Sequence, residues 1–202
     1  MGPVVSPIPP LAPEAALMKA TDLQPEDQGE LRFMCAKHPS LEVHVSKDGT
    51  TVEWTRGEAA WVQCPTTAHL HSGLYRVTFD TVLKGDQIGV GFLLDGAKAG
   101  PDWGFFGYLG ASGTAWAYDP WTGDVVTATR SIESGLPTFD RACDAGTVVL
   151  ELHLPRAGPG SAIFLVDGKA SRAIELPESS VVVPAACLLQ VGQSCTVSAL
   201  AL

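Results

Sequence analysis

The chain has 202 residues, of which 46% are hydrophobic, and its formal net charge is -9. This length allows one substantial hydrophobic core and is short for two full domains. The acidic balance argues against nucleic acid and an anionic membrane as partners, because both favour clustered Lys and Arg. We therefore expect a single domain that binds neither nucleic acid nor membrane.

The five cysteines form an odd set without the Cys-x-x-Cys spacing that is typical of zinc sites. No apolar run of about 18 residues occurs, and the Pro-rich start lacks the basic and apolar pattern of a secretory signal. The sequence contains no Asn, so it offers no N-glycosylation acceptor. We expect reduced thiols, no disulfide and a cytoplasmic or nuclear location. The cysteines are Cys35, Cys64, Cys143, Cys187 and Cys195.

Residues 1–30 are rich in Pro and in acidic or small residues, and only residues 13–20 offer a short helical candidate. We interpret them as an N-terminal tail that is available to strap onto the domain. From Leu31 onward, short runs of alternating apolar residues are separated by Gly, Asp and Pro. This spacing predicts an all-β, two-sheet antiparallel sandwich over residues 31–202.

Fourteen strands are expected in this domain, and none of its segments predicts a helix of more than three turns. Alternation within the apolar strands predicts Phe79, Trp103 and Phe105 as core residues, with Trp103 and Phe164 on facing sheets. The predicted strands are 32–36, 41–46, 51–54, 61–64, 73–83, 87–94, 103–109, 115–118, 125–129, 147–154, 161–166, 173–176, 181–188 and 194–201.

The last third of the chain carries the most informative pattern. An apolar strand in 162–169 breaks at an Asp-Gly turn, a Pro-containing strand follows in 183–188, and a final strand covers 191–197. Together with an early hairpin and Gly-led or Trp-Gly segments in the family's order, this pattern resembles a SPRY domain, especially one from a SOCS-box protein. The resemblance covers residues 41–202. The earlier segments are 45–52, 72–79, 88–92, 102–105 and 146–152.

The resemblance implies a non-catalytic module that binds another protein, without a cofactor. The chain departs from the family pattern in three places. Arg76 and Val77 replace a common Trp-Glu pair, Thr147 replaces a usual Asp, and the chain ends at Leu202, which leaves no room for a SOCS box.

The same resemblance implies that three loops, 54–58, 95–102 and 190–192, converge at one end of the sandwich to hold an extended peptide. Arg56 would supply a planar charged contact and Val191 an apolar floor. Trp121, in a turn with Pro and Gly, either folds back over the sandwich or anchors a partner, and both roles stay open. The candidate partner-binding residues are Trp54, Arg56, Glu58, Asp95, Lys98, Asp102, Trp121, Gln190 and Val191.

Other functions are weaker alternatives. His69 and His71 have a legitimate spacing for metal ligands but no third ligand nearby, and Glu53 and Glu151 are unpaired in pattern. We therefore predict no catalytic centre and no metal site, in a protein that is monomeric. The main rival is a lectin-like sandwich that binds sugar through the aromatic and acidic turn 118–124, and a purely structural subunit is a third possibility.

Overall fold

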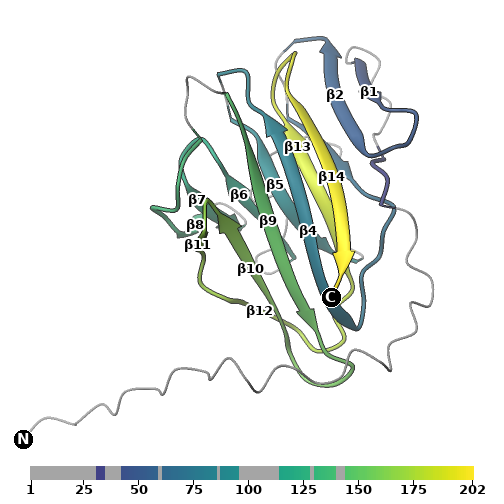
Figure 1. Ribbon diagram of the computed structural model, residues 1–202, viewed down its shortest axis with the longest axis vertical. Helices are drawn as coiled ribbons and strands as arrows, with labels where there is room; N and C mark the ends of the chain where they lie inside the picture. The colour runs from purple at the N-terminus through teal and green to yellow at the C-terminus, as the bar shows by residue number, and fades with distance from the viewer. Residues whose placement is uncertain are drawn as a thin grey trace, which may run out of the picture.

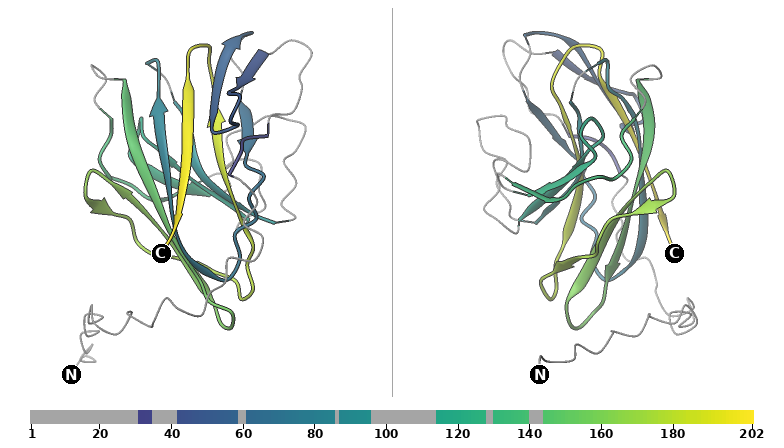
Figure 2. Two further views of the ribbon diagram at one scale, coloured as in Figure 1. Left: turned by 45° about the vertical axis from the view of Figure 1, so that its right-hand side comes forward. Right: turned by 90° about the vertical axis from the view of Figure 1, so that its left-hand side faces the viewer.

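The computed structural model describes residues 31–34, 42–58, 61–85, 87–95, 114–127, 130–139 and 144–202. These residues form two antiparallel β-sheets that pack face to face (Figure 1, Figure 2), and no helix occurs among them. The predicted all-β sandwich is confirmed. The predicted N-terminal tail, residues 1–30, lies outside the described residues.

The larger sheet has eight strands, and the last strand of the chain lies near one edge of it (Figure 1). Strand β14 lies between β2 and β4, so segments from both ends of the described chain pair with each other. In their order of pairing the strands are β1 (Glu42–Val45), β2 (Thr51–Arg56), β14 (Ser194–Ala201), β4 (Gly73–Val82), β9 (Ala145–Leu154), β10 (Gly160–Val166) and β11 (Lys169–Ala170), and β12 (Ile174–Leu176) also pairs with β10.

The smaller sheet has six strands, all antiparallel to their neighbours. Strand β13 pairs with β5 on one side and β3 on the other, which places it inside the sheet rather than at an edge. In order of pairing the strands are β3 (Val62–Pro65), β13 (Val182–Leu188), β5 (Gly89–Leu94), β6 (Ala115–Asp119), β7 (Asp124–Thr127) and β8 (Arg130–Glu133).

The core lies between the sheets and follows the two-residue period of the strands. On β4, Tyr75, Val77 and Phe79 are buried, whereas Leu74 and Arg76, which alternate with them, are exposed on the outer face. The predicted core position of Phe79 is confirmed. This alternation fixes which side chains of the larger sheet can reach solvent.

Aromatic rings join the two layers. Phe92 on β5 and Phe164 on β10 belong to different sheets, and their ring centroids are 6.3 Å apart. Phe92 also stacks on Trp116 of β6 with centroids 5.0 Å apart. Phe164 is fully buried, as predicted, but Trp103 and Phe105 lie outside the described residues.

The central strands of the smaller sheet are buried on both faces, which explains their nearly continuous apolar runs. A Cβ at Gly91 on β5 would lie 2.1 Å from the carbonyl oxygen of Trp116 on the neighbouring strand, so this position requires glycine. The predicted close packing at this glycine is confirmed. A second apolar cluster on the sheet's outer face consists of Leu93, Ala115, Ala117, Val183, Ala185 and Cys187.

Most predicted strands agree with the observed ones to within a few residues. The Asp167-Gly168 turn is confirmed, since both residues have positive φ and join β10 to β11. The strand predicted over 32–36 is wrong within the described residues, where a single bridge joins Phe33 to Thr66. Strands β8 and β11 were not predicted, and 103–109 lies outside the described residues.

Candidate functional site at one end of the sandwich

Four connections meet at one end of the sandwich, which we call the Gln193 end. They are the end of β2 at 56–58, the β4–β5 connection at Lys84, Gly85 and Gln87, the β6–β7 turn at 120–123, and the β13–β14 turn at 189–193. Antiparallel pairing brings these connections to the same side, because β2, β4, β6 and β13 all run toward this end.

Gln193 holds two of these connections together through its fully buried side chain. Its Oε1 accepts hydrogen bonds from the backbone N–H groups of Leu189 at 2.6 Å and Gln190 at 3.1 Å. Its Nε2 donates to the carbonyl oxygens of Leu83 and Gln87, both at 2.8 Å. All four contacts are to backbone groups, so this amide fixes the β13–β14 turn against the β4–β5 connection.

The end of β2 is fastened to the same turn. The N–H of Gly192 donates to the carbonyl oxygen of Trp54 at 2.8 Å, and the N–H of Trp54 donates to that of Gln193 at 3.0 Å. The loops predicted at 54–58 and 190–192 are therefore neighbours, as expected. Arg56 and Glu58 are exposed beside Val191, whose exposed fraction is 46%.

Trp54 itself is not part of the exposed surface, which corrects its predicted role in binding. Its side chain is fully buried, and its indole Nε1 donates to the carbonyl oxygen of Arg56 at 2.9 Å. The sequence interpretation ended the strand at Trp54, but β2 continues to Arg56. Alternation along the longer strand turns Val52 and Trp54 inward together.

The β6–β7 turn reaches the Gln193 end through Gln87 and Asp119. The Nε2 of Gln87 donates to Oδ2 of Asp119 at 3.2 Å, and Asp119 Oδ1 accepts the N–H of Trp121 at 2.9 Å. Burial raises the pKa of Asp119 above its ordinary value, against the opposing effect of hydrogen bonds from Trp121 and Thr122. Trp121 is half-buried and packs partly on the main core, so it folds back while keeping an exposed edge.

A second segment braces this turn from the side. The N–H of Leu136 donates to the carbonyl oxygen of Gly123, and the N–H of Phe139 donates to that of Pro120. Gly123 has a φ of 74°, and a Cβ there would lie 2.3 Å from the carbonyl oxygen of Leu136. The hydroxyl of Tyr118 also donates to the carbonyl oxygen of Pro137. The turn that carries Trp121 is therefore held on both sides.

Lys84 adds a second positive charge to the Gln193 end. It is exposed, and its carbonyl oxygen accepts the Nε2 of Gln190 at 2.5 Å. The next residue, Gly85, donates its N–H to Oδ1 of Asp144 at 2.6 Å. Sequence reasoning missed Lys84 and Gln193, because a polar residue in a turn gives no sign of which backbone groups it contacts.

Asp95 lies at the opposite end, which contradicts the predicted convergence of three loops. Strand β5 is antiparallel to β13, so Asp95 is hydrogen-bonded to Val181, before the start of β13, whereas Gln190 follows its end. Seven strand residues separate these positions by roughly 20 Å. Asp95 instead pairs with His69 at 3.5 Å. Lys98 and Asp102 lie outside the described residues.

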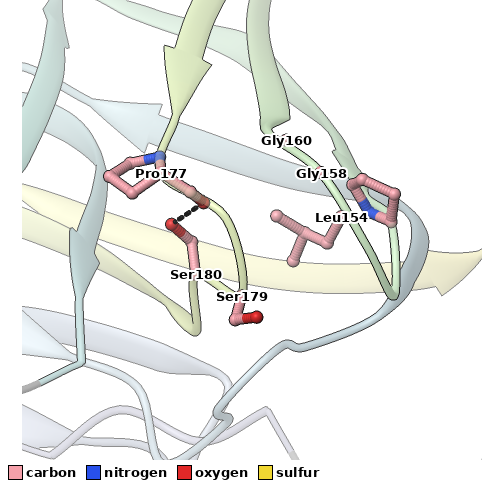
Figure 3. A pocket seen from close by; sticks show the side chains of 7 residues that line it. Leu154, Gly158, Gly160, Pro177, Ser179 and Ser180 are labelled. Carbon is pink, nitrogen blue, oxygen red and sulfur yellow. Dashed lines mark hydrogen bonds between the residues drawn. The ribbon is translucent and has the colours of Figure 1, made fainter.

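The opposite end also has a shallow depression of about 150 Å³ that is open to solvent (Figure 3). It is lined by apolar and small residues, and its Ser180 hydroxyl donates to the carbonyl oxygen of Pro177 at 2.7 Å. It is open to solvent and is not an enclosed cleft of the kind that usually holds a small ligand. Its lining residues are Leu154, Pro155, Gly158, Gly160, Pro177, Ser179 and Ser180.

The described part of the chain contains neither a cluster of metal-ligating side chains nor a membrane-spanning helix. No group of three or more His, Cys, Asp or Glu side chains in it could hold a metal ion. His69 and His71 therefore have no third ligand among the described residues. Within the same ranges, no helix is long and apolar enough to cross a bilayer.

The fold of the chain is similar to that of solved SPRY domains. The chain matches no protein-family model, and no curated protein is similar to it in sequence. A human SPRY domain matches 77% of the chain over 93% of its own length, with 13% identity and a TM-score of 0.54. The SPRY domain of human HERC1 has 15% identity, coverage of 77% and 91%, and a TM-score of 0.51. The TRIM65 PSpry domain has 14% identity, coverage of 84% and 92%, and a TM-score of 0.53.

Proposed function

We propose that this chain, a SPRY-type β-sandwich, is a non-catalytic protein-interaction module whose partner is an extended peptide or loop that binds at the Gln193 end. The observation that carries the proposal is the combination of a rigid backbone platform with exposed, chemically mixed side chains. Loops on a rigid scaffold are frequent sites of binding. The bonds of Gln193 and Gly192 give this end such a scaffold.

The exposed side chains suit a peptide better than a small molecule. Arg56 offers a planar donor set for a carboxylate or a backbone carbonyl, and Val191 beside it offers apolar contact. Lys84 and Glu58 add charges of both signs around them. Such an arrangement is typical of a recognition surface with an apolar centre and a polar rim.

Preorganisation supports binding here, because ordering a mobile loop costs free energy that a fixed loop has already spent. The β13–β14 turn has its N–H groups at Leu189 and Gln190 bonded to one buried amide. Val191 is therefore presented from a turn whose neighbours are fixed. A peptide would find this contact in place before it binds.

Selection of random peptides displayed on phage against the wild-type domain tests this proposal. Peptides that bind should lose at least about tenfold in affinity for the double variant Arg56→Ala, Val191→Asp, which corresponds to about 1.4 kcal/mol. A matched double variant at the opposite end, His69→Ala with Asp95→Ala, should bind as the wild type does. Failure to select any peptide, or equal loss in both variants, would overturn the proposal.

A further inference from the structure

The last strand has an open edge over its second half. Strand β14 pairs with β4 from Ser194 to Ala201, but with β2 only from Ser194 to Thr196. The last contact on the β2 side is the N–H of Val197, which donates to the carbonyl oxygen of Thr50 at 2.8 Å. In Figure 1, β2 lies beside the upper part of β14 only. The sheet therefore has a notch beside 198–201.

The direction of the backbone groups at this notch follows from antiparallel pairing. Leu202 donates its N–H to the carbonyl oxygen of Leu74 on β4 at 2.9 Å. Successive residues of a strand direct these groups to opposite sides, so Leu200 and Leu202 face β4 while Ala199 and Ala201 face away from it. Among the described residues, no hydrogen-bond partner occupies that side beyond Val197.

Exposure confirms that the edge is uncovered. Ser198, Ala199, Leu200 and Ala201 are all exposed, although Ala199 lies opposite the fully buried Val77 on β4. Leu200 has an exposed fraction of 59%, the largest among the large hydrophobic side chains of the described residues. An apolar residue of this size at a free strand edge is a feature that proteins usually avoid.

The sequence of this edge lacks the usual protection against pairing. Residues 196–202 read Thr-Val-Ser-Ala-Leu-Ala-Leu and contain neither a charge nor a proline. The other outer strands of the described sheets carry such residues: Glu42 in β1, Pro65 in β3, Arg130 and Glu133 in β8, Lys169 in β11 and Glu175 in β12. Charged residues and proline keep edges unpaired, so the edge of β14 differs from the rest.

We propose that this edge pairs with the same edge of a second copy of the chain. An antiparallel pairing with a twofold axis at Leu200 places Ala199 of each copy opposite Ala201 of the other. Both alanines direct their N–H and C=O groups to the edge, so these residues form the hydrogen-bonded pairs. Leu200 then lies opposite its own symmetry mate in the closer, non-hydrogen-bonded position. The two eight-stranded sheets become one continuous sheet.

Charge favours a second copy at this position over other parts of the surface. The net charge of -9 repels two copies, but residues 196–202 at the edge carry no charged side chain. On the adjacent face, Arg76 forms an ion pair of 2.5 Å with Glu151, so the nearest exposed charges on β4 and β9 cancel. Since salt screens the remaining repulsion, association should strengthen between low and moderate salt. This dimer differs from the monomer that the sequence predicted.

Sedimentation equilibrium of the intact chain tests the pairing from about 10 μM to about 1 mM, where small interfaces associate. The wild type should approach twice the mass of one chain. Ala199→Pro should weaken association at least about tenfold, because it removes an edge donor without touching the bonds to β4. Ala199→Ser keeps the N–H and is the matched control. Leu200→Lys should have the same effect as the proline.

Each result decides the proposal. A wild type that stays at the mass of one chain up to about 1 mM overturns it. A dimer that survives Ala199→Pro, with its fold confirmed by thermal melting, but is lost in Leu74→Lys would show that the sheet face pairs instead of the edge. Peptide binding at the Gln193 end should be unchanged in Ala199→Pro, so the two proposals fail independently.

Discussion

A chain of hydrogen bonds crosses the sandwich from the buried amide of Gln193, through Gln87, to the carboxylate of Asp119. The Nε2 of Gln193 lies 2.8 Å from the carbonyl oxygen of Gln87, and the Nε2 of Gln87 lies 3.2 Å from the carboxylate of Asp119. Strand β14 and the β6–β7 turn belong to different sheets. This chain of contacts therefore links the turn at Val191 to the turn at Trp121.

Removal of the Gln193 amide should be among the more destabilising polar substitutions. Gln193→Ala leaves four backbone groups without this partner, one of them in a buried contact and three in partly buried ones, so the free energy of unfolding should fall by about 3 kcal/mol. Urea denaturation measures this change. Gln190→Ala is the control, because its partly buried amide donates to the carbonyl oxygen of Lys84 near the surface, and its loss should cost less than about 1 kcal/mol. Equal losses in the two variants would contradict the role given to Gln193.

Substitutions at Trp54 and Arg56 should have very different effects on the free energy of unfolding. Trp54→Ala empties a fully buried position and should lower the free energy of unfolding by about 3 to 5 kcal/mol. Arg56→Ala changes an exposed side chain two residues away and should alter it by no more than about 0.5 kcal/mol. Thermal melting of both variants checks the pair. If Trp54→Ala left stability unchanged, Trp54 would instead belong to the exposed loop that the sequence predicted.

Asp119 should make stability depend on pH in an unusual direction. Burial raises its pKa in the folded state above the ordinary 3.8, so the folded protein binds the proton more tightly than the unfolded chain does. Its contribution to stability is therefore full below pH 3.8 and is lost as pH rises through the folded pKa. As pH rises through that window, the wild type should therefore lose stability relative to Asp119→Asn, whose side chain does not titrate. Urea denaturation of both proteins at a series of pH values measures this change.

Asp48 provides a control of opposite sign for this titration. Hydrogen bonds from Ser46 and Thr50 lower its pKa, so its contribution is present above pH 3.8 and is lost as pH falls through the folded pKa. Asp48→Asn should therefore remove stability mainly at neutral pH. Parallel pH profiles for the Asp119 and Asp48 variants would refute the assignment of either shift.

The three described cysteines should be inert in the native protein. Cys64, Cys187 and Cys195 are buried and form no disulfide, and burial raises the pKa of Cys195 far above that of an ordinary thiol. Cys187 on β13 and Cys195 on β14 belong to different sheets. Alkylation followed by peptide mass mapping should find all three unmodified until denaturant is added. A two-dalton deficit in a peptide pair that contains them would show a disulfide.

The β-sandwich could be predicted from the sequence because its strands, turns and buried positions follow from local residue patterns. Alternation in β4 and β10, the Asp167-Gly168 turn and the glycine at Gly91 each state a local requirement that a sequence can show. The position of Asp95 was not predictable, since it depends on which strand pairs with β5. The order of family-like loops in the sequence suggested convergence, but the antiparallel pairing with β13 separates Asp95 from Gln190.

The candidate site could be predicted only in part for the same reason. The local sequence pattern already indicated that Arg56 and Val191 are exposed. Their closeness in space depends on a single strand pairing, between β2 and β14. The contacts of the Gln193 side chain depend on two connections that meet in space, and a sequence gives no measure of that distance. The burial of Trp54 follows from its alternation with Val52 in β2, which the loop assigned to 54–58 did not take into account.

Trp121 decides how far the binding surface extends. Its indole is half-buried on the core and lies beyond Gln87 and Asp119 from Val191. If the bound peptide crosses the whole Gln193 end, Trp121→Ala should weaken peptide binding by about 1 to 2 kcal/mol, and by much less if contact is confined to Arg56 and Val191. Isothermal titration with a selected peptide measures the loss.

Trp121→Phe is the matched variant for this measurement, because it keeps an aromatic ring over the core and limits the loss of stability. Melting temperatures of both variants show how much of any effect comes from unfolding. Undiminished binding by the Arg56→Ala, Val191→Asp double variant, together with loss of binding in Trp121→Ala, would move the site to the turn 118–124. That result would assign recognition to the exposed edge of the indole, held in place by the buried carboxylate of Asp119.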